Sequence, residues 1–291
     1  MFKKTSKKFF VRLIFLTILV LSLITVLKKY FPNQFTYHFQ SKSLNYATDI
    51  GNLKSCQIRR LESLPESFSV IIGHAYGQNT SQDGYVASNI LKFLKGNRNN
   101  IEKIVFTGDL FSVPSLHKWK RLFNEFKLME IFIAPGNHDV LRPDSRDVFE
   151  ASHFITQDYP YEAIIGGLNF VFDDSVVSKW LVDKKVQGQI ADSKSQSIIV
   201  ARHHVFIKEL VTFANSQSTP TPLPSVDQFI KSFPSKKSVT WIMGDGGGNK
   251  SLPRLTCHSF GNHRFIINGI GEVENDTVLI IYEGDIFSYV I

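Results

Sequence analysis

Short apolar runs alternate with segments of helical spacing in the first half of this chain, and this alternation limits the fold more than any other feature. The runs at residues 68–72, 103–107 and 131–134 have the length and apolar character of buried strands. Apolar residues between these runs recur every three or four positions, as on one helix face, at Val86, Ile90, Leu91 and Leu94 and again at Leu116, Trp119, Leu122, Phe123 and Phe126. Strand–helix–strand alternation predicts right-handed crossovers and a parallel sheet.

The second half of the chain is richer in strands. Apolar runs of strand length, several of them separated by turn residues, lie at 169–172, 197–201, 239–243, 264–268, 277–282 and 286–290. The two halves together predict an α/β fold that is built in layers rather than as one doubly wound sheet.

The first 30 residues predict a short cytoplasmic tail and a membrane anchor. Residues 9–27 contain one charged side chain, Arg12, and approach the roughly 20 apolar residues that span a bilayer. A cleaved signal peptide is the alternative, but small residues suited to cleavage are missing after the apolar run. Five basic residues precede the apolar core and two follow it, which predicts a single-pass protein whose globular domain is extracytoplasmic. A polar, aperiodic linker is then expected at 31–66 and the folded domain at 67–291.

The chain of 291 residues has a net charge of +7, and this charge comes from the N-terminus. Seven of the 33 Lys and Arg residues lie in residues 1–29, which contain no Asp or Glu, and the other 26 are balanced by 26 acidic residues. A domain that binds the backbone of nucleic acid usually carries an excess of basic charge. Nucleic acid is therefore not an expected partner, and the sequence gives no signal for an oligomeric state.

The chain has two cysteines, Cys56 and Cys257. They either form one disulfide or are two separate buried thiols, and the sequence leaves both alternatives open. There is no Cys-x-x-Cys pair, so a zinc ribbon or a thioredoxin-type site has no support.

Polar strings follow three of the predicted strands: Gly108-Asp109, Gly136-Asn137-His138-Asp139 and His203-His204. A turn alone can explain the first string, and a histidine pair can form hydrogen bonds in a core. The second string is more specific, because adjacent Asn and His at a strand exit have no packing role. Carboxylate, amide and imidazole groups brought from strand ends into one crevice suit a hydrolytic metal centre.

Together these strings resemble the calcineurin-like metallophosphoesterases, whose motifs are Asp-x-His, Gly-Asp, Gly-Asn-His-Asp or -Glu, a His, and Gly-His-x-His. The order and strand context hold over about residues 68–247. The resemblance implies a layered α/β/β/α sandwich, with two sheets flanked by helices. It also implies one divalent ion, with two possible, and manganese, iron and zinc all suit such ligands.

The resemblance implies a role for each residue of the strings. Asp109 would bridge two ions, and Asn137 and His203 would bind the second ion. His138 would lie beside the scissile phosphate, as an acid for the leaving group or as a transition-state contact. Asp139 is grouped with His138 as a catalytic candidate. His204 is a secondary candidate.

Two motifs depart from the family pattern. Ile72-Gly73-His74 stands where the family has Asp-x-His, which keeps His74 as a metal ligand candidate and loses the carboxylate. The last motif falls on Gly244-Asp245-Gly246-Gly247, where Asp245 can replace one imidazole and Gly247 has no side chain. The first ion therefore keeps only His74 and Asp109. Nearby polar residues are alternative donors, although an ordinary loop role is the favoured interpretation of each: Tyr76, Gln78, Asn79, His258 and His263.

The sequence thus predicts a membrane-anchored phosphoesterase that hydrolyses a phosphate ester at the cell envelope by metal-activated water. Phosphorylated small molecules, lipid-linked phosphates and glycan phosphates are the expected substrates. The main alternative is a catalytically degenerate scaffold that acts as a binding or envelope-assembly protein. A single-metal hydrolase of another bond is a weaker alternative. No Gly-x-Ser-x-Gly or His-Glu-x-x-His string supports a serine hydrolase or a zincin.

Overall fold

The structure is a computed structural model, and it describes residues 48–77, 84–152, 158–216, 218–233, 236–247, 252–271 and 276–291. These residues belong to one compact unit. The predicted tail and anchor at residues 1–30, and the first part of the predicted linker, lie outside the described residues. Among those described, no helix has the length and apolar character needed to cross a membrane.

A five-stranded sheet contains the alternating elements of the first half. Its order is β12-β11-β2-β3-β4, in which β2, β3 and β4 are parallel and β11 and β12 are antiparallel additions. Helices α3 (Ser88–Gly96) and α4 (Leu116–Glu125) make the two crossovers, as the apolar spacing predicts. The strands are β2 (Phe68–Ile72), β3 (Ile101–Phe106), β4 (Glu130–Ile133), β11 (Thr277–Tyr282) and β12 (Asp285–Val290).

The second sheet has seven strands in the order β1-β9-β10-β8-β7-β6-β5. Its central strands β6, β7, β8 and β10 are parallel, and β5, β9 and β1 pair antiparallel at the two edges. The strands are β1 (Lys54–Ser55), β5 (Tyr161–Ile165), β6 (Leu168–Phe172), β7 (Ser197–Arg202), β8 (Ser238–Met243), β9 (Leu255–Phe260) and β10 (His263–Asn268). The helices that follow or join these strands are α7 (Lys184–Asp192), the 3-10 helix η1 (Lys208–Phe213) and α8 (Val226–Ser232).

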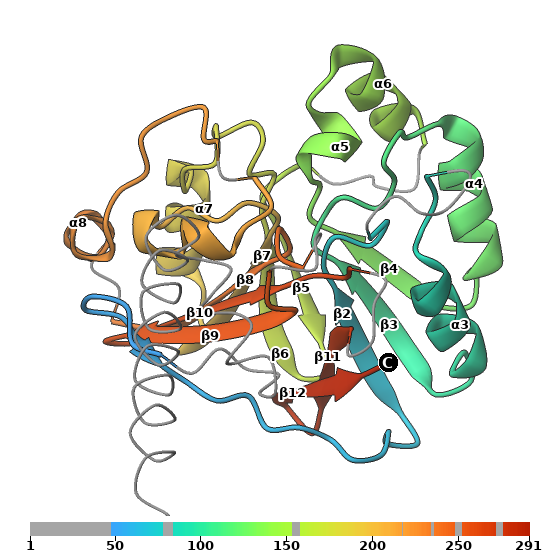
Figure 1. Cartoon of the computed structure of the whole chain (residues 1–291), viewed down its shortest axis with the longest axis horizontal. Helices are drawn as coiled ribbons and strands as arrows, with labels where there is room; N and C mark the ends of the chain where they lie inside the picture. The colour runs from blue at the N-terminus through green and yellow to red at the C-terminus, as the bar shows by residue number, and fades with distance from the viewer. Residues whose placement is uncertain are drawn as a thin grey trace, which may run out of the picture. The chain divides into compact units, whose positions relative to one another are not determined.

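Three apolar clusters hold the layers together. One lies between the sheets and joins Ile71 and Val105 of the smaller sheet to Phe172 of the larger one. A second packs α3 and α4 on the smaller sheet, and a third packs α7, α8 and η1 on the larger sheet. Figure 1 shows α3 and α4 on one side of the strands and α7 and α8 on the other. The architecture is therefore the α/β/β/α sandwich that the resemblance implies.

The segment before β2 differs from the linker that the sequence predicts. Leu53 and Ile58 are buried, Arg60 forms a backbone bridge with Ser288, and Cys56 forms a disulfide with Cys257 on β9. Residues 48–66 therefore belong to the folded domain, which starts earlier than residue 67. A two-residue strand and a single cross-link produce no periodic pattern, so the sequence does not reveal this attachment.

Candidate metal centre

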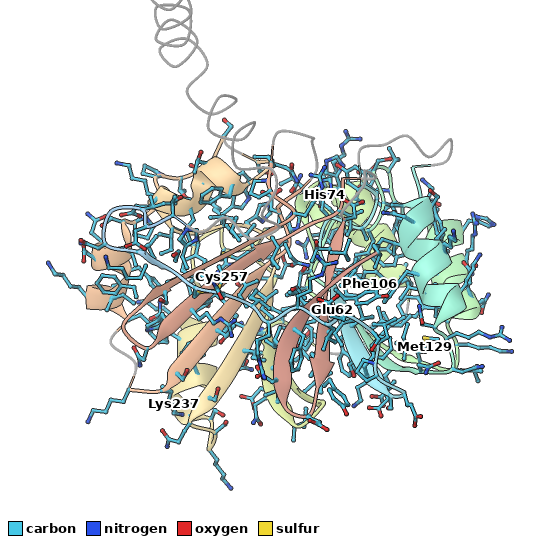
Figure 2. The ribbon with its side chains drawn as sticks, turned by 60° about the horizontal axis from the view of Figure 1, so that its bottom comes forward. Glu62, His74, Phe106, Met129, Lys237 and Cys257 are labelled. Atoms are coloured by element: carbon cyan, nitrogen blue, oxygen red, sulfur yellow. A yellow bond between two sulfur atoms is a disulfide. The ribbon has the colours of Figure 1, made fainter. Side chains whose placement is uncertain are left out.

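Candidate ligands come from five strand ends on one edge of the sandwich. His74 follows β2, Asp109 follows β3, and Asn137 follows β4 and opens the short helix α5 (Asn137–Val140). His203 and Asp245 follow β7 and β8 of the other sheet. Figure 2 shows His74 at this edge and Lys237, which precedes β8, at the opposite edge. The carboxyl ends of parallel strands thus bring the predicted residues to one place.

Asp109 is the centre of this group. Its Oδ2 lies 3.3 Å from Nε2 of His203 and 3.7 Å from Nε2 of His74. Its Oδ1 accepts a hydrogen bond of 3.0 Å from the backbone N–H of His138. The Asp109 side chain is buried, so these polar neighbours replace water around its carboxylate.

The imidazole of His203 is oriented to offer a lone pair to this group. Its Nδ1 lies 2.9 Å from the carbonyl oxygen of Thr107, which can only accept, so Nδ1 carries a proton. Its Nε2 faces Asp109 and lies 3.8 Å from Oδ1 of Asp245. Nε2 of His203 and Oδ1 of Asp245 are buried and have no hydrogen-bond partner among the described residues. A backbone carbonyl that fixes the tautomer of a histidine is typical of a metal ligand.

The electrostatics of the group favour a positive charge between the carboxylates. Burial alone would lower the pKa of His203, but Asp109 and Asp245 raise it to about 9. Burial also disfavours the charge on Asp109, yet His203 and His74 hold the pKa of Asp109 below its usual value. Burial raises the pKa of Asp245 to about 6. The site therefore attracts a proton, and a metal ion supplies the same positive charge.

His204 supports Asn137. Its Nε2 lies 3.0 Å from Oδ1 of Asn137, its Nδ1 lies 2.9 Å from Oγ of Ser175, and Trp180 stacks on its ring at 4.3 Å. Burial places the pKa of His204 well below its usual value, so the ring is neutral. Both nitrogens are used inside the protein, and His204 therefore orients the Asn137 amide.

The Asp139 carboxylate connects two loops through hydrogen bonds to their backbones. Its carboxylate accepts hydrogen bonds from the backbone N–H groups of Asp109, Leu110 and Gly136, at 2.7, 3.1 and 3.0 Å. Burial, followed by the nearby Asp109, raises the pKa of Asp139 to about 7. The contacts of Asp139 hold the Asp109 and Gly136 loops together, which is a positioning role. The catalytic role that the sequence suggests for it stays a prediction.

His138 lies between two oxygen atoms. Its Nδ1 is 2.9 Å from the carbonyl oxygen of Ser112, and its Nε2 is 3.3 Å from the hydroxyl of Tyr76. Tyr76 is interpreted from sequence as an ordinary loop residue, but only 8% of it is exposed and its ring also contacts His74. The sequence signal that could have found it is its place two residues beyond a histidine at a strand end.

The register of β2 places the residues of the first motif. Ile72 pairs with Phe106 in the parallel sheet and packs in the core under α3 and α4. Two residues beyond this pair, His74 lies opposite Gly108 and therefore beside Asp109. Both His74 and Asp109 have a left-handed backbone, with φ of 49° and 55°. The side chain that reaches the site at this strand end is therefore His74, and Ile72 does not occupy a ligand position. Burial lowers the pKa of His74 to about 4, so its imidazole is neutral.

The glycines after β8 leave no space for a further ligand. Gly247 has φ of 68°, and a Cβ there would collide with the carbonyl of Gly269. A Cβ on Gly244 would collide with the carbonyl of Thr107. Backbone therefore packs on backbone at this strand end, and Asp245 is the residue that contributes a side chain.

These contacts decide how well the residues fit a metal ion. In the part of the chain that the structure describes, no group of three or more His, Cys, Asp or Glu side chains is arranged to hold one. The donors instead form three pairs, His74–Asp109, Asp109–His203 and His203–Asp245, at 3.7, 3.3 and 3.8 Å. Neighbouring ligands of a tetrahedral ion with bonds of about 2.1 Å lie ~3.4 Å apart, so small side-chain movements would complete a site for one ion. The unpartnered atoms of His203 and Asp245 are the ones that this ion would satisfy.

An α/β/β/α sandwich with carboxylate, amide and imidazole groups at its strand ends offers the kinds of ligand that a hydrolytic metal centre uses. Comparison with protein families agrees, because the family model described as calcineurin-like phosphoesterase matches residues 83–266. This match covers more than half of the chain, and the protein belongs to this family. No curated protein matches the chain.

Proposed function

We propose that the protein is a phosphoesterase that hydrolyses a phosphate ester with one divalent ion. Membership of the calcineurin-like phosphoesterases makes a phosphoric ester hydrolase the expected class of enzyme. The observation that carries the one-ion proposal is the buried series Asp109–His203–Asp245, two of whose donor atoms have no other partner among the described residues. Manganese, iron and zinc suit these oxygen and imidazole donors.

Asp109, His203 and Asp245 would hold the ion, with the Asn137 amide beside them. A bound divalent ion supplies Lewis-acid activation of a phosphoryl oxygen and lowers the pKa of an attacking water. The protein keeps the ligands in place through the His138 N–H on Asp109 and the Thr107 carbonyl on His203.

His138 is the proposed proton donor to the leaving oxygen. Its Nδ1–H is fixed on the carbonyl of Ser112, which leaves Nε2 as the atom that exchanges a proton with the substrate. The backbone N–H of His138 binds Asp109, so the imidazole is attached to the same loop as the ion ligands. One backbone hydrogen bond therefore connects the proposed proton donor to an ion ligand.

The location of the reaction at the cell envelope is also a proposal. It rests on the apolar run at residues 9–27 and on the basic residues before it. The Cys56–Cys257 disulfide supports it, because disulfides persist in oxidising compartments outside the cytoplasm. Lipid-linked and glycan phosphates are the substrates that an anchored site of this kind would meet.

The test uses the full-length chain purified in detergent micelles with added Mn²⁺. About one ion per chain and metal-stimulated hydrolysis of a phosphomonoester or phosphodiester panel are expected. His138→Ala should abolish turnover without removing the ion, and His203→Gln should remove both. Exposed His117, on α4, provides the matched control as His117→Gln.

A non-catalytic scaffold is the second candidate. The lack of a preformed group of three ligands in the described residues, and the closed glycine strand end, favour it. Metal-replete protein that retains almost no ion and hydrolyses none of the panel would establish the scaffold and reject the enzyme.

A further inference from the structure

We propose that Tyr76 is a positioning residue for His138, and that its hydroxyl donates a hydrogen bond to the lone pair on Nε2 of His138. This inference rests on the proposed function only for its kinetic consequence. The hydrogen bond itself follows from the contacts of the two side chains.

The tautomer of His138 fixes the direction of this hydrogen bond. The carbonyl of Ser112, 2.9 Å from Nδ1, has no proton to give, so Nδ1 must donate. A neutral imidazole with a protonated Nδ1 has a lone pair on Nε2. The hydroxyl of Tyr76, 3.3 Å away, is the donor that the structure places at this lone pair.

Tyr76 is held in this position from several directions. Its backbone N–H donates to the carbonyl of Asp109 at 3.2 Å, which attaches it to the loop of the metal site. Its ring contacts the rings of His74 and His138, with centroids 4.5 and 5.1 Å away. The phenol therefore cannot turn away from His138 without breaking contacts on both sides.

In the proposed reaction, the hydrogen bond from Tyr76 would act on His138 once His138 has given up its proton. As water forms the new P–O bond and loses a proton to solvent, the bond from phosphorus to the leaving oxygen breaks. Protonated His138 gives its Nε2 proton to that oxygen, which leaves as an alcohol. The bare Nε2 then accepts from the Tyr76 hydroxyl until solvent returns the proton. Tyr76 thus keeps the ring of His138 aligned after the transfer, because its O–H donates to the in-plane lone pair that the departing alcohol leaves exposed on Nε2.

The leaving group provides the sharpest test. An alkyl phosphate needs a proton on its leaving oxygen, whereas a nitrophenyl phosphate leaves readily without one. Tyr76→Phe retains the ring and removes the hydroxyl. We expect about a tenfold lower kcat on the alkyl ester, with kcat on the nitrophenyl ester and both KM values changed less than about twofold.

Tyr161→Phe is the matched control. Tyr161 lies on the edge strand β5, and its hydroxyl donates a hydrogen bond of 3.4 Å to the carbonyl of Ile133. This variant loses a hydroxyl of the same kind and should behave as the unchanged protein on both esters.

Side-chain ¹⁵N NMR of the full-length protein tests the hydrogen bond without turnover. The His138 signal is assigned by its loss in His138→Gln. Tyr76→Phe should shift the Nε2 resonance of His138, and Tyr161→Phe should not. The metal content of Tyr76→Phe should equal that of the unchanged protein.

An unshifted His138 resonance overturns the proposal, as does equal loss of kcat on both esters. Loss of the ion in Tyr76→Phe also overturns it, since Tyr76 would then act as a ligand. If no variant and no unchanged protein hydrolyses any ester, the proposed function fails, while the NMR comparison still decides the hydrogen bond.

Discussion

The Oδ2 atom of Asp109 lies 3.3 Å from Nε2 of His203, and both side chains are buried where the two sheets meet at their carboxyl ends. One residue follows a strand of the five-stranded sheet and the other follows a strand of the seven-stranded sheet. A ligand that binds both therefore joins the two layers of the sandwich. Metal binding should consequently be visible in the stability of the whole domain.

Divalent ions are expected to raise the melting temperature of the full-length protein. An ion that binds only the folded state at 100 times its Kd adds about 2.7 kcal/mol of stability. His203→Gln removes the imidazole donor between Asp109 and Asp245, and its melting temperature should not respond to Mn²⁺. Scanning fluorimetry with and without Mn²⁺ measures both responses, with His117→Gln as the control. An equal rise in His203→Gln would place the ion elsewhere.

Replacement of Asp139 should lower stability because of its three backbone partners. In Asp139→Asn, one oxygen becomes an NH₂ group that faces a backbone N–H, which leaves a buried donor unsatisfied. The expected loss is about 2 kcal/mol in the free energy of unfolding. Urea denaturation measures it, and exposed Asp147→Asn should change the value by less than about 0.5 kcal/mol. Unchanged stability together with lost turnover would indicate a direct catalytic role for Asp139.

The sequence predicts the layers well because buried strands and amphipathic helices have distinct periods. It predicts the place of the candidate site for a related reason, since polar residues that follow buried strands must collect at one edge of a parallel sheet. Asp109, His203 and Asp245 are recognisable in this way from the printed sequence alone.

The roles of individual residues are less accessible, because they depend on which atom faces which partner. His203 and His204 are adjacent and chemically identical, yet His203 directs Nε2 toward the carboxylates of Asp109 and Asp245, whereas His204 uses both nitrogens on neutral partners. The first motif depends on the same detail: Ile72 packs in the core under the helices, whereas His74, two residues further on, lies beside Asp109. The sequence does not show that residues 48–66 belong to the folded domain, because a disulfide and a two-residue strand produce no periodic pattern of apolar residues.

Gly247→His is not expected to restore the missing ligand. The backbone at this position has φ of 68° and lies against the carbonyl of Gly269, so the new side chain meets both backbone strain and a collision. Gly261→His is the matched control, because Gly261 has φ of 58° with open space around it and carries only the strain. That strain costs roughly 1–2 kcal/mol. The melting temperature of Gly247→His should be well below that of Gly261→His, and elemental analysis should find no additional ion in it. A folded Gly247→His protein with a second ion would contradict the packing described for this strand end.

Acid should destabilise the domain through His263, which lies on β10 away from the candidate site. Its Nδ1 accepts a hydrogen bond of 3.1 Å from the indole N–H of Trp241, and burial lowers the pKa of His263 from 6.5 to about 4. The unfolded chain therefore binds a proton at higher pH than the folded protein does. Stability should fall as the pH drops from about 6.5 to about 4 and should not change through this residue above pH 7.

His263→Asn isolates this effect, because the amide oxygen can still accept from Trp241 and the side chain does not titrate. Its melting temperature should start lower at pH 7.5, since a smaller side chain packs less well against Phe229 and Phe265. The difference between the two melting temperatures should then narrow as the pH falls below about 6.5, because only the unchanged protein loses stability by keeping this ring neutral. Melting curves that stay parallel from pH 7.5 to pH 5 would show that His263 is protonated equally in the folded and unfolded states.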